Sequence, residues 1–140
     1  MLTIEACEEI WPLKKVFRIS RGSRSEAQVV VVTVGNDGHI GRGEGVPIKR
    51  YGQSVESMLA QIEAIKAEKN LDRERLQQLL PAGAARNGLD CALWDLEAKI
   101  SGKRVWELAN TRIVPEVETS FTISLDTPEK MAASAKEVAL

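Results

Sequence analysis

The stretch from Ala84 to Gly102 constrains the fold more than any other part of this 140-residue sequence. Its larger apolar residues recur at the spacing of one helix face: Leu89, Leu93, Leu96 and Ile100. A second stripe along the same stretch holds only small residues: Ala85, Gly88 and Ala92. Glycine inside a helix costs roughly 1 kcal/mol relative to alanine, so its presence indicates that another backbone approaches closely. We therefore predict a central helix with two packing faces, ended by Gly102.

The first part of the sequence predicts an antiparallel meander of three strands. Residues 2–11 form the first strand, which we expect Pro12 to end, because proline has no amide to donate to a sheet. Residues 26–35 form the clearest strand, and their four consecutive valines indicate burial on both faces. Asn36-Asp37-Gly38 suits a tight hairpin turn, so residues 39–46 are expected to return as the third strand.

A run of helices follows the meander. Ser54 is placed to cap a helix over residues 55–68, and Asp72 is placed to cap a shorter one over 73–80. A short helix over 105–108 comes after the central helix. Strands first and helices afterwards predict an α+β fold: a three-stranded antiparallel meander followed by a helix bundle.

The pattern changes after residue 112. Apolar and polar residues alternate over 117–125, which predicts a strand, and Thr127-Pro128 then suits the N-cap and first position of a helix. One strand and one helix make a single β/α unit, which cannot bury a parallel strand by itself. We therefore expect residues 1–112 to form one domain and residues 113–140 to begin a (β/α) barrel that the sequence truncates.

Composition argues against several classes of function. The formal net charge is −1, and 44% of the residues are hydrophobic, which is ordinary for a globular protein and gives no pull toward nucleic acid or a membrane. The first residues lack the basic region and apolar run of a leader, so we expect a cytoplasmic protein. Cys7 and Cys91 match no metal or redox spacing, and we expect two buried, unpaired thiols.

Basic side chains concentrate in one segment, residues 14–25, which we expect to be a loop. The segment holds five basic residues and no acidic one: Lys14, Lys15, Arg18, Arg21 and Arg24. A solvated loop is the plainest interpretation. An anion-binding site is the functional one, because a guanidinium presents a planar fork to a carboxylate. Nucleic acid is a weaker alternative, since Phe17 is the only aromatic residue nearby.

The remaining candidates carry less information. Residues 46–54 are either an ordinary connection or the wall of a pocket, with Tyr51 as its aromatic member. The glycines of Gly41-Arg42-Gly43-Glu44-Gly45 do not precede a helix, so they favour close strand packing over phosphate binding. His39 is the only histidine in the sequence and is interpreted as a surface residue without a functional role. Three carboxylates on the central helix are interpreted as structural or surface residues and not as metal ligands, because Asp90 and Asp95 face different sides of the helix: Asp90, Asp95 and Glu97.

Several of these stretches resemble one family. Asn87-Gly88-Leu89-Asp90-Cys91-Ala92-Leu93-Trp94-Asp95-Leu96 resembles the signature helix of the enolase superfamily, in its muconate-lactonizing branch. Residues 17–26 are similar to the mobile loop of the dipeptide epimerases in that branch. Residues 46–54 resemble their second specificity loop, and residues 118–131 resemble their first barrel strand and turn. The likeness covers essentially the whole sequence and implies an N-terminal capping domain followed by the start of the barrel.

The resemblance also implies roles for four residues. Arg24 matches the arginine that binds the acidic side chain of the substrate, and Arg21 is the nearby competitor for that role. Thr122 falls near the carboxyl end of the first barrel strand, where barrel enzymes carry their sites, and is expected to face substrate unless it is a packed strand threonine. Tyr51 is expected to wall the same site.

The implied reaction is epimerisation of a dipeptide with an acidic residue, of the L-Ala-D/L-Glu type. A proton α to a carboxylate is exchanged by two lysines while Mg²⁺ stabilises the enediolate, and the resemblance places those lysines and the metal ligands beyond Leu140. No catalytic residue or metal ligand is therefore expected in residues 1–140, and the complete enzyme is expected to be a homo-oligomer. The alternatives are a muconate cycloisomerase, an N-acylamino-acid racemase, and a non-catalytic α+β interaction domain.

Overall fold

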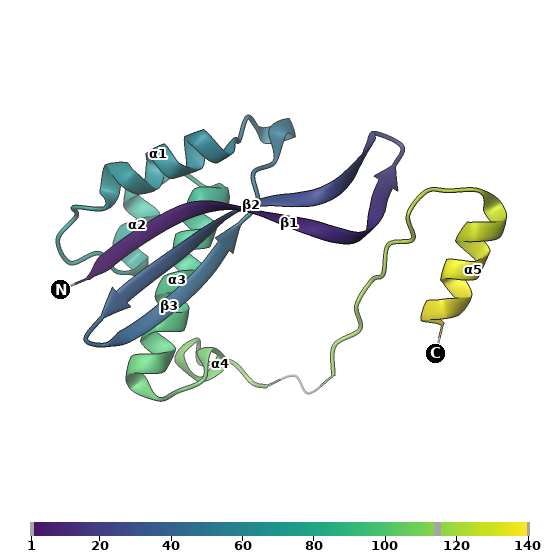
Figure 1. The fold of residues 1–140 in the computed structure, drawn as a ribbon. Helices are drawn as coiled ribbons and strands as arrows, with labels where there is room; N and C mark the ends of the chain where they lie inside the picture. Colours follow the sequence, from purple (N-terminus) through teal and green to yellow (C-terminus); the bar gives the residue numbers. More distant parts are fainter. Residues whose placement is uncertain (1, 114–115, 140) are drawn as a thin grey trace. The chain divides into compact units, whose positions relative to one another are not determined.

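The computed structural model describes residues 2–113 and 116–139, which form two compact units. The first unit contains residues 2–9 and 28–113, and the second contains residues 10–27 and 116–139. The elements, labelled in Figure 1, follow in this order: β1 (Thr3–Ile19), β2 (Gly22–Asn36), β3 (His39–Gly45), the 3₁₀ turn η1 (Lys49–Tyr51), α1 (Val55–Ile65), α2 (Arg73–Leu79), α3 (Ala84–Ser101), α4 (Val105–Leu108) and α5 (Pro128–Val138).

The sheet is the predicted three-stranded meander, in the order β1-β2-β3. Strands β2 and β3 are antiparallel, with Val30 opposite Gly45 and Asn36 opposite His39. Between them, Asp37 and Gly38 both adopt positive φ, 49° and 79°, as a two-residue hairpin turn of the primed type requires. The predicted turn is therefore confirmed, and it sets the register of the two strands.

Helix α3 packs against β3 through its stripe of small residues. Figure 1 shows α3 lying against one face of the sheet. A β-carbon on Gly43 would collide with the carbonyl oxygen of Gly88, and one on Gly45 would lie 2.5 Å from the carbonyl oxygen of Ala84. Two strand residues advance roughly 6.6 Å and four helix residues roughly 6 Å, so the successive glycines Gly41, Gly43 and Gly45 meet successive turns of α3 at Ala92, Gly88 and Ala84. Close packing, the predicted reason for the glycines of β3, is confirmed.

The other face of α3 completes the core of the first unit. Leu89, Leu93 and Leu96 are buried with Val30, Val32 and Val34 of β2 and with apolar residues of α1 and α2. Ser54 and Asp72 cap α1 and α2 as predicted, their side chains accepting hydrogen bonds from the amides of Ser57 (3.1 Å) and Arg75 (2.7 Å). Ile100, the last residue of the predicted apolar stripe, lies 47% exposed beyond this core.

Two predicted strand ends are wrong. Strand β1 continues through Pro12 to Ile19, and the expected loop over 14–25 is instead the end of β1, a turn at Ser20 and Arg21, and the start of β2. Strand β1 is at the edge of the sheet, so no partner strand lies along its outer side. Proline is tolerated on such a strand because its missing amide then breaks no hydrogen bond between strands.

Three further predictions need correction. Residues 117–125 form no strand, because a barrel strand needs partners along both edges. Helix α5 begins at Pro128 as predicted, but the Thr127 side chain makes no capping hydrogen bond. Cys7 and Cys91 are free thiols as expected but exposed rather than buried, since they lie on the sides of their elements that face away from the core cluster.

Candidate functional site

The basic segment predicted from sequence lies on a long β-hairpin, which we call the hairpin arm (residues 10–27). Its apolar residues favour a strand: Val16, Phe17 and Ile19 are β-branched or aromatic. The turn at Ser20 and Arg21 leads into Gly22, whose φ of 154° is one that residues with a side chain rarely adopt. The arm therefore depends on glycine at that position to bring β2 back alongside β1.

All five basic side chains of the arm are exposed: Lys14, Lys15, Arg18, Arg21 and Arg24. The guanidinium carbon of Arg24 lies 5.5 Å from the centroid of the Phe17 ring, within the range of a cation–π contact. Lys15 approaches Glu137 of α5 at 3.6 Å, but both side chains are more than two-thirds exposed, so this pair adds little stability. The arm thus presents a concentrated positive charge, and an aromatic ring restrains one of its arginines.

The segment that precedes α5 is hydrogen-bonded to the outer edge of the arm. The amide of Arg18 donates to Ser124 Oγ (2.9 Å), and the Ser124 hydroxyl donates to the carbonyl oxygen of Val16 (3.2 Å). The amide of Leu125 donates to the carbonyl oxygen of Arg18 (2.9 Å). These three bonds join residues more than 100 positions apart in the sequence. We call this set of bonds the Ser124 latch.

The carboxylate of Asp126 comes directly after the residues of the Ser124 latch in the sequence. The Thr127 amide and the Lys130 ammonium donate hydrogen bonds to Asp126, and with the charges of Lys130 and Arg18 they lower the pKa of this carboxyl below its ordinary value. Asp126 is therefore ionised at neutral pH. Its charge offsets part of the positive charge at Arg18 and leaves the tip of the arm as the more positive end.

The four site residues predicted from sequence fall into two groups. Arg21 lies in the turn of the arm, Arg24 lies on its β2 strand, and Thr122 lies two residues before Ser124. These three belong to the second unit, and the latch joins their two segments. Tyr51 belongs to the first unit, where it ends η1 and is 69% exposed. Sequence patterns did not identify Phe17 or Ser124 as site residues, because their importance depends on contacts across the arm.

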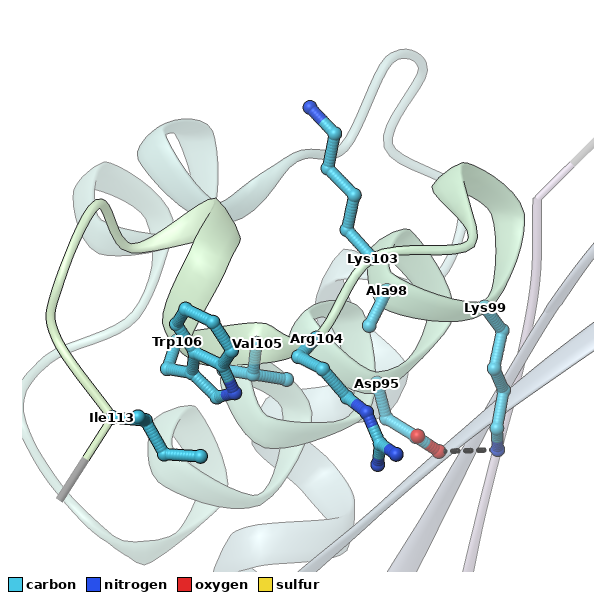
Figure 2. A pocket seen from close by; sticks show the side chains of 8 residues that line it. All are labelled: Asp95, Ala98, Lys99, Lys103, Arg104, Val105, Trp106 and Ile113. Atoms are coloured by element: carbon cyan, nitrogen blue, oxygen red, sulfur yellow. Dashed lines mark hydrogen bonds and ion pairs between the residues drawn. The ribbon is translucent and has the colours of Figure 1, made fainter. Parts of the chain in front are cut away.

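A separate pocket of about 630 Å³ lies beside the C-terminal end of α3 in the first unit. Figure 2 shows the eight residues that line it, with Lys103 extending away from Asp95 and Arg104. The Lys99 ammonium donates to Asp95 (2.6 Å) and to the carbonyl oxygen of Ile40 (2.7 Å). Asp95 also accepts from the Arg42 amide (2.8 Å). The charged groups of Lys99 and Asp95 therefore both bind α3 to β3.

The titration of Asp95 follows from these contacts. Partial burial raises its pKa, but the hydrogen bonds from Lys99 and Arg42, together with their charges, outweigh burial and lower the pKa overall. The other two helix carboxylates also hold structural contacts: Glu97 binds Arg73 at 3.0 Å, and Asp90 accepts from Gln77 at 3.3 Å. This agrees with the structural role predicted for all three.

The residues described by the structure do not fit a metal centre. Within residues 2–113 and 116–139, no three histidine, cysteine or acidic side chains converge in a way that would hold a metal ion. No step that involves a metal is therefore assigned to them. In the same part of the chain, no helix is long and apolar enough to cross a membrane.

The fold and the arm define a class of protein: an α+β domain, with a three-stranded meander followed by helices, that carries a cationic hairpin. Residues 1–109 match the family model of the mandelate racemase / muconate lactonizing enzyme N-terminal domain. The chain is 49% identical over 137 residues to the L-Ala-D/L-Glu epimerase of Escherichia coli K12, covering 96% of this chain and 43% of that enzyme. It is 37% identical over 107 residues to an N-acetyl-D-glutamate racemase of Pseudoalteromonas, covering 74% of this chain and 34% of that enzyme.

A solved structure supports the same family assignment. The chain superposes on an enolase family member from Agrobacterium tumefaciens, with homology to dipeptide epimerases and with sodium and L-Ala-L-Glu bound, at a TM-score of 0.91 and 44% identity. That match covers 98% of this chain and 43% of the other. The protein belongs to the mandelate racemase / muconate lactonizing enzyme family of the enolase superfamily, and the chain corresponds to its N-terminal domain. It spans less than half the length of these relatives.

Proposed function

We propose that this chain is the N-terminal part of an epimerase that acts on dipeptides with an acidic residue, of the L-Ala-D/L-Glu type. One observation carries the proposal: 49% identity over 137 residues to the E. coli L-Ala-D/L-Glu epimerase leaves almost none of this chain outside the match. The match therefore includes the hairpin arm and the segment around Thr122, where family members with other substrates would be expected to differ.

In this proposal the chain recognises the substrate and does not exchange the proton. We infer from the family resemblance that the two lysines and the Mg²⁺ ligands lie beyond Leu140. Arg24 binds the side-chain carboxylate of the dipeptide, since a carboxylate taken out of water needs a paired cation. Arg21 adds charge at the tip of the arm, and Thr122 lines the same site; Tyr51 is a further proposed substrate-binding residue of the complete enzyme.

A second candidate is a racemase of N-acylated glutamate. The 37% identity to the Pseudoalteromonas N-acetyl-D-glutamate racemase favours it. Both substrates carry an acidic side chain, so the arm would serve either one. They differ at the other end, where the dipeptide has a free ammonium group and the acylated amino acid does not.

One assay separates the two candidates. The complete protein is incubated in D₂O with L-Ala-L-Glu or with N-acetyl-D-glutamate, and loss of the α-proton signal of the glutamate residue is followed by NMR. The proposal expects faster exchange, measured as kcat/KM, with the dipeptide. Faster exchange with N-acetyl-D-glutamate would replace it with the second candidate, and no exchange with either substrate would overturn both.

Three further features belong to the same proposal. We place the domain boundary at residues 112 and 113, with the rest of the protein forming a (β/α) barrel that holds Mg²⁺ in the complete enzyme. The two free cysteines suit a reducing compartment such as the cytoplasm. We expect an assembly of identical subunits, the commonest form of soluble oligomer.

A further inference from the structure

The Ser124 latch involves backbone groups that an edge strand normally leaves to water. Strand β1 is at the edge of the sheet, and alternate residues of a strand point their amides and carbonyls to the same side. Val16 and Arg18 are such a pair, and their outward groups bind Ser124 and Leu125. The Ser124 hydroxyl accepts one hydrogen bond and donates another, so a single side chain bridges two positions of the edge.

The latch connects the two segments that carry the proposed recognition residues. Arg24 lies on the β2 strand of the arm, and β2 is hydrogen-bonded to β1. Thr122 lies two residues before Ser124 on the other segment. Asp126, ionised and close enough to Arg18 for their charges to interact, adds attraction at the same place.

We propose that Ser124 is a positioning residue for substrate recognition. Its hydroxyl fixes the edge of the hairpin arm at Val16 and Arg18 to the segment before α5, so that the hairpin carrying Arg24 is anchored beside the segment carrying Thr122. Holding a binding group in its bound position lowers the entropic cost of binding. This inference rests on the proposed function for its consequence, but the latch itself is a structural claim that is testable without substrate.

The structural test is amide hydrogen exchange in the complete protein. Ser124→Ala removes the acceptor of the Arg18 amide, so exchange at Arg18 should become roughly 2- to 12-fold faster, the range expected for one hydrogen bond. Ser124→Thr keeps a hydroxyl and should restore slow exchange. Ser120→Ala, a change at another exposed serine of the same segment, is the matched control and should leave Arg18 unchanged. Unaltered exchange at Arg18 in Ser124→Ala would overturn the latch, whatever the protein catalyses.

The functional test uses the same variants with two dipeptides. Ser124→Ala should raise KM for L-Ala-L-Glu roughly 2- to 12-fold and change kcat less, because the chemical groups lie outside this chain. KM for L-Ala-L-Leu should change less, since Arg24 has no carboxylate to bind there. If Arg18 exchange accelerates while KM for the acidic dipeptide is unchanged, Ser124 is only structural and the positioning role is wrong. If the wild type epimerises neither dipeptide, the proposed function and the positioning role are both wrong. The exchange rate at Arg18 still shows whether the Ser124 latch exists.

Discussion

Replacing Gly43 by alanine tests the close packing of β3 on α3. The added β-carbon would collide with the carbonyl oxygen of Gly88 and would lie 2.7 Å from the amide nitrogen of Ala92. Both are backbone atoms of one buried helix, so a side-chain rotation does not relieve the contact. Overpacking of this kind costs about 1–3 kcal/mol, and the rigid neighbours here favour the upper part of that range.

Gly88→Ala is the matched control, because it adds the same methyl group on the other side of the same interface. Its β-carbon would meet the Gly45 amide nitrogen at 3.2 Å and a Val32 methyl at 3.4 Å, contacts that a small shift relieves. Alanine also gains roughly 1 kcal/mol in helix propensity over glycine. We therefore expect Gly88→Ala to stay within about 1 kcal/mol of the wild type. Gly88→Leu, which no small shift accommodates, should lose about 1–3 kcal/mol or more.

Urea denaturation of the complete protein measures these differences through the midpoint of unfolding. The midpoint should fall clearly for Gly43→Ala and hardly at all for Gly88→Ala. Equal midpoints for wild type and Gly43→Ala would refute the glycine-to-carbonyl packing. So would a loss in Gly88→Ala as large as the loss in Gly43→Ala, since the two sides of the interface would then be equally tight.

Three other variants test individual contacts. Phe17→Leu removes the ring beside Arg24 and should reduce the preference for acidic over neutral dipeptides roughly two- to fivefold, whereas Phe17→Tyr should keep it. Arg73→Ala removes a guanidinium 3.4 Å from the Trp94 ring centroid and should lower the free energy of unfolding by about 1–2 kcal/mol; Arg73→Lys should restore only part, because an ammonium does not stack as a planar guanidinium does. Asp95 has a lowered pKa in the folded state, so its contribution to stability is present above its unfolded value, near 3.8, and is lost as pH falls through the lower folded value. The stability difference between wild type and Asp95→Asn, measured in urea from pH 7 to pH 3, should therefore shrink below about pH 4; a constant difference would mean that the carboxylate charge is not what stabilises the fold.

Much of the first unit could be predicted because its signals are local. The two stripes of α3 are visible at helical spacing, and the Asp37-Gly38 turn follows from the need for positive φ. The glycines of β3 indicate close packing without identifying the partner helix. Each of these signals comes from residues that are near one another in the sequence.

The errors arose where a neighbouring segment decides the outcome. Pro12 would end an inner strand but is tolerated at an edge, and sequence alone does not show that β1 is an edge. The alternation over 117–125 is typical of a strand, yet a strand forms only where partners supply hydrogen bonds. Ser124 gave no signal, because a serine in an alternating stretch gains its role only when residues 16–18 come alongside. The basic residues of the arm were found from charge, and their assignment to substrate came from family resemblance.

The most direct test of the account is the substrate preference of Arg24→Ala in the complete enzyme. Values of kcat/KM are measured for L-Ala-L-Glu and L-Ala-L-Leu with the wild type, Arg24→Ala and the control Arg21→Ala. Loss of a charge-assisted hydrogen bond, worth about 1.5–3 kcal/mol, should raise KM for the acidic dipeptide roughly 12- to 160-fold and leave the neutral dipeptide nearly unaffected. Arg21→Ala should have the smaller effect. Equal losses on both dipeptides in Arg24→Ala would contradict the account, because Arg24 would then shape the arm without recognising substrate charge.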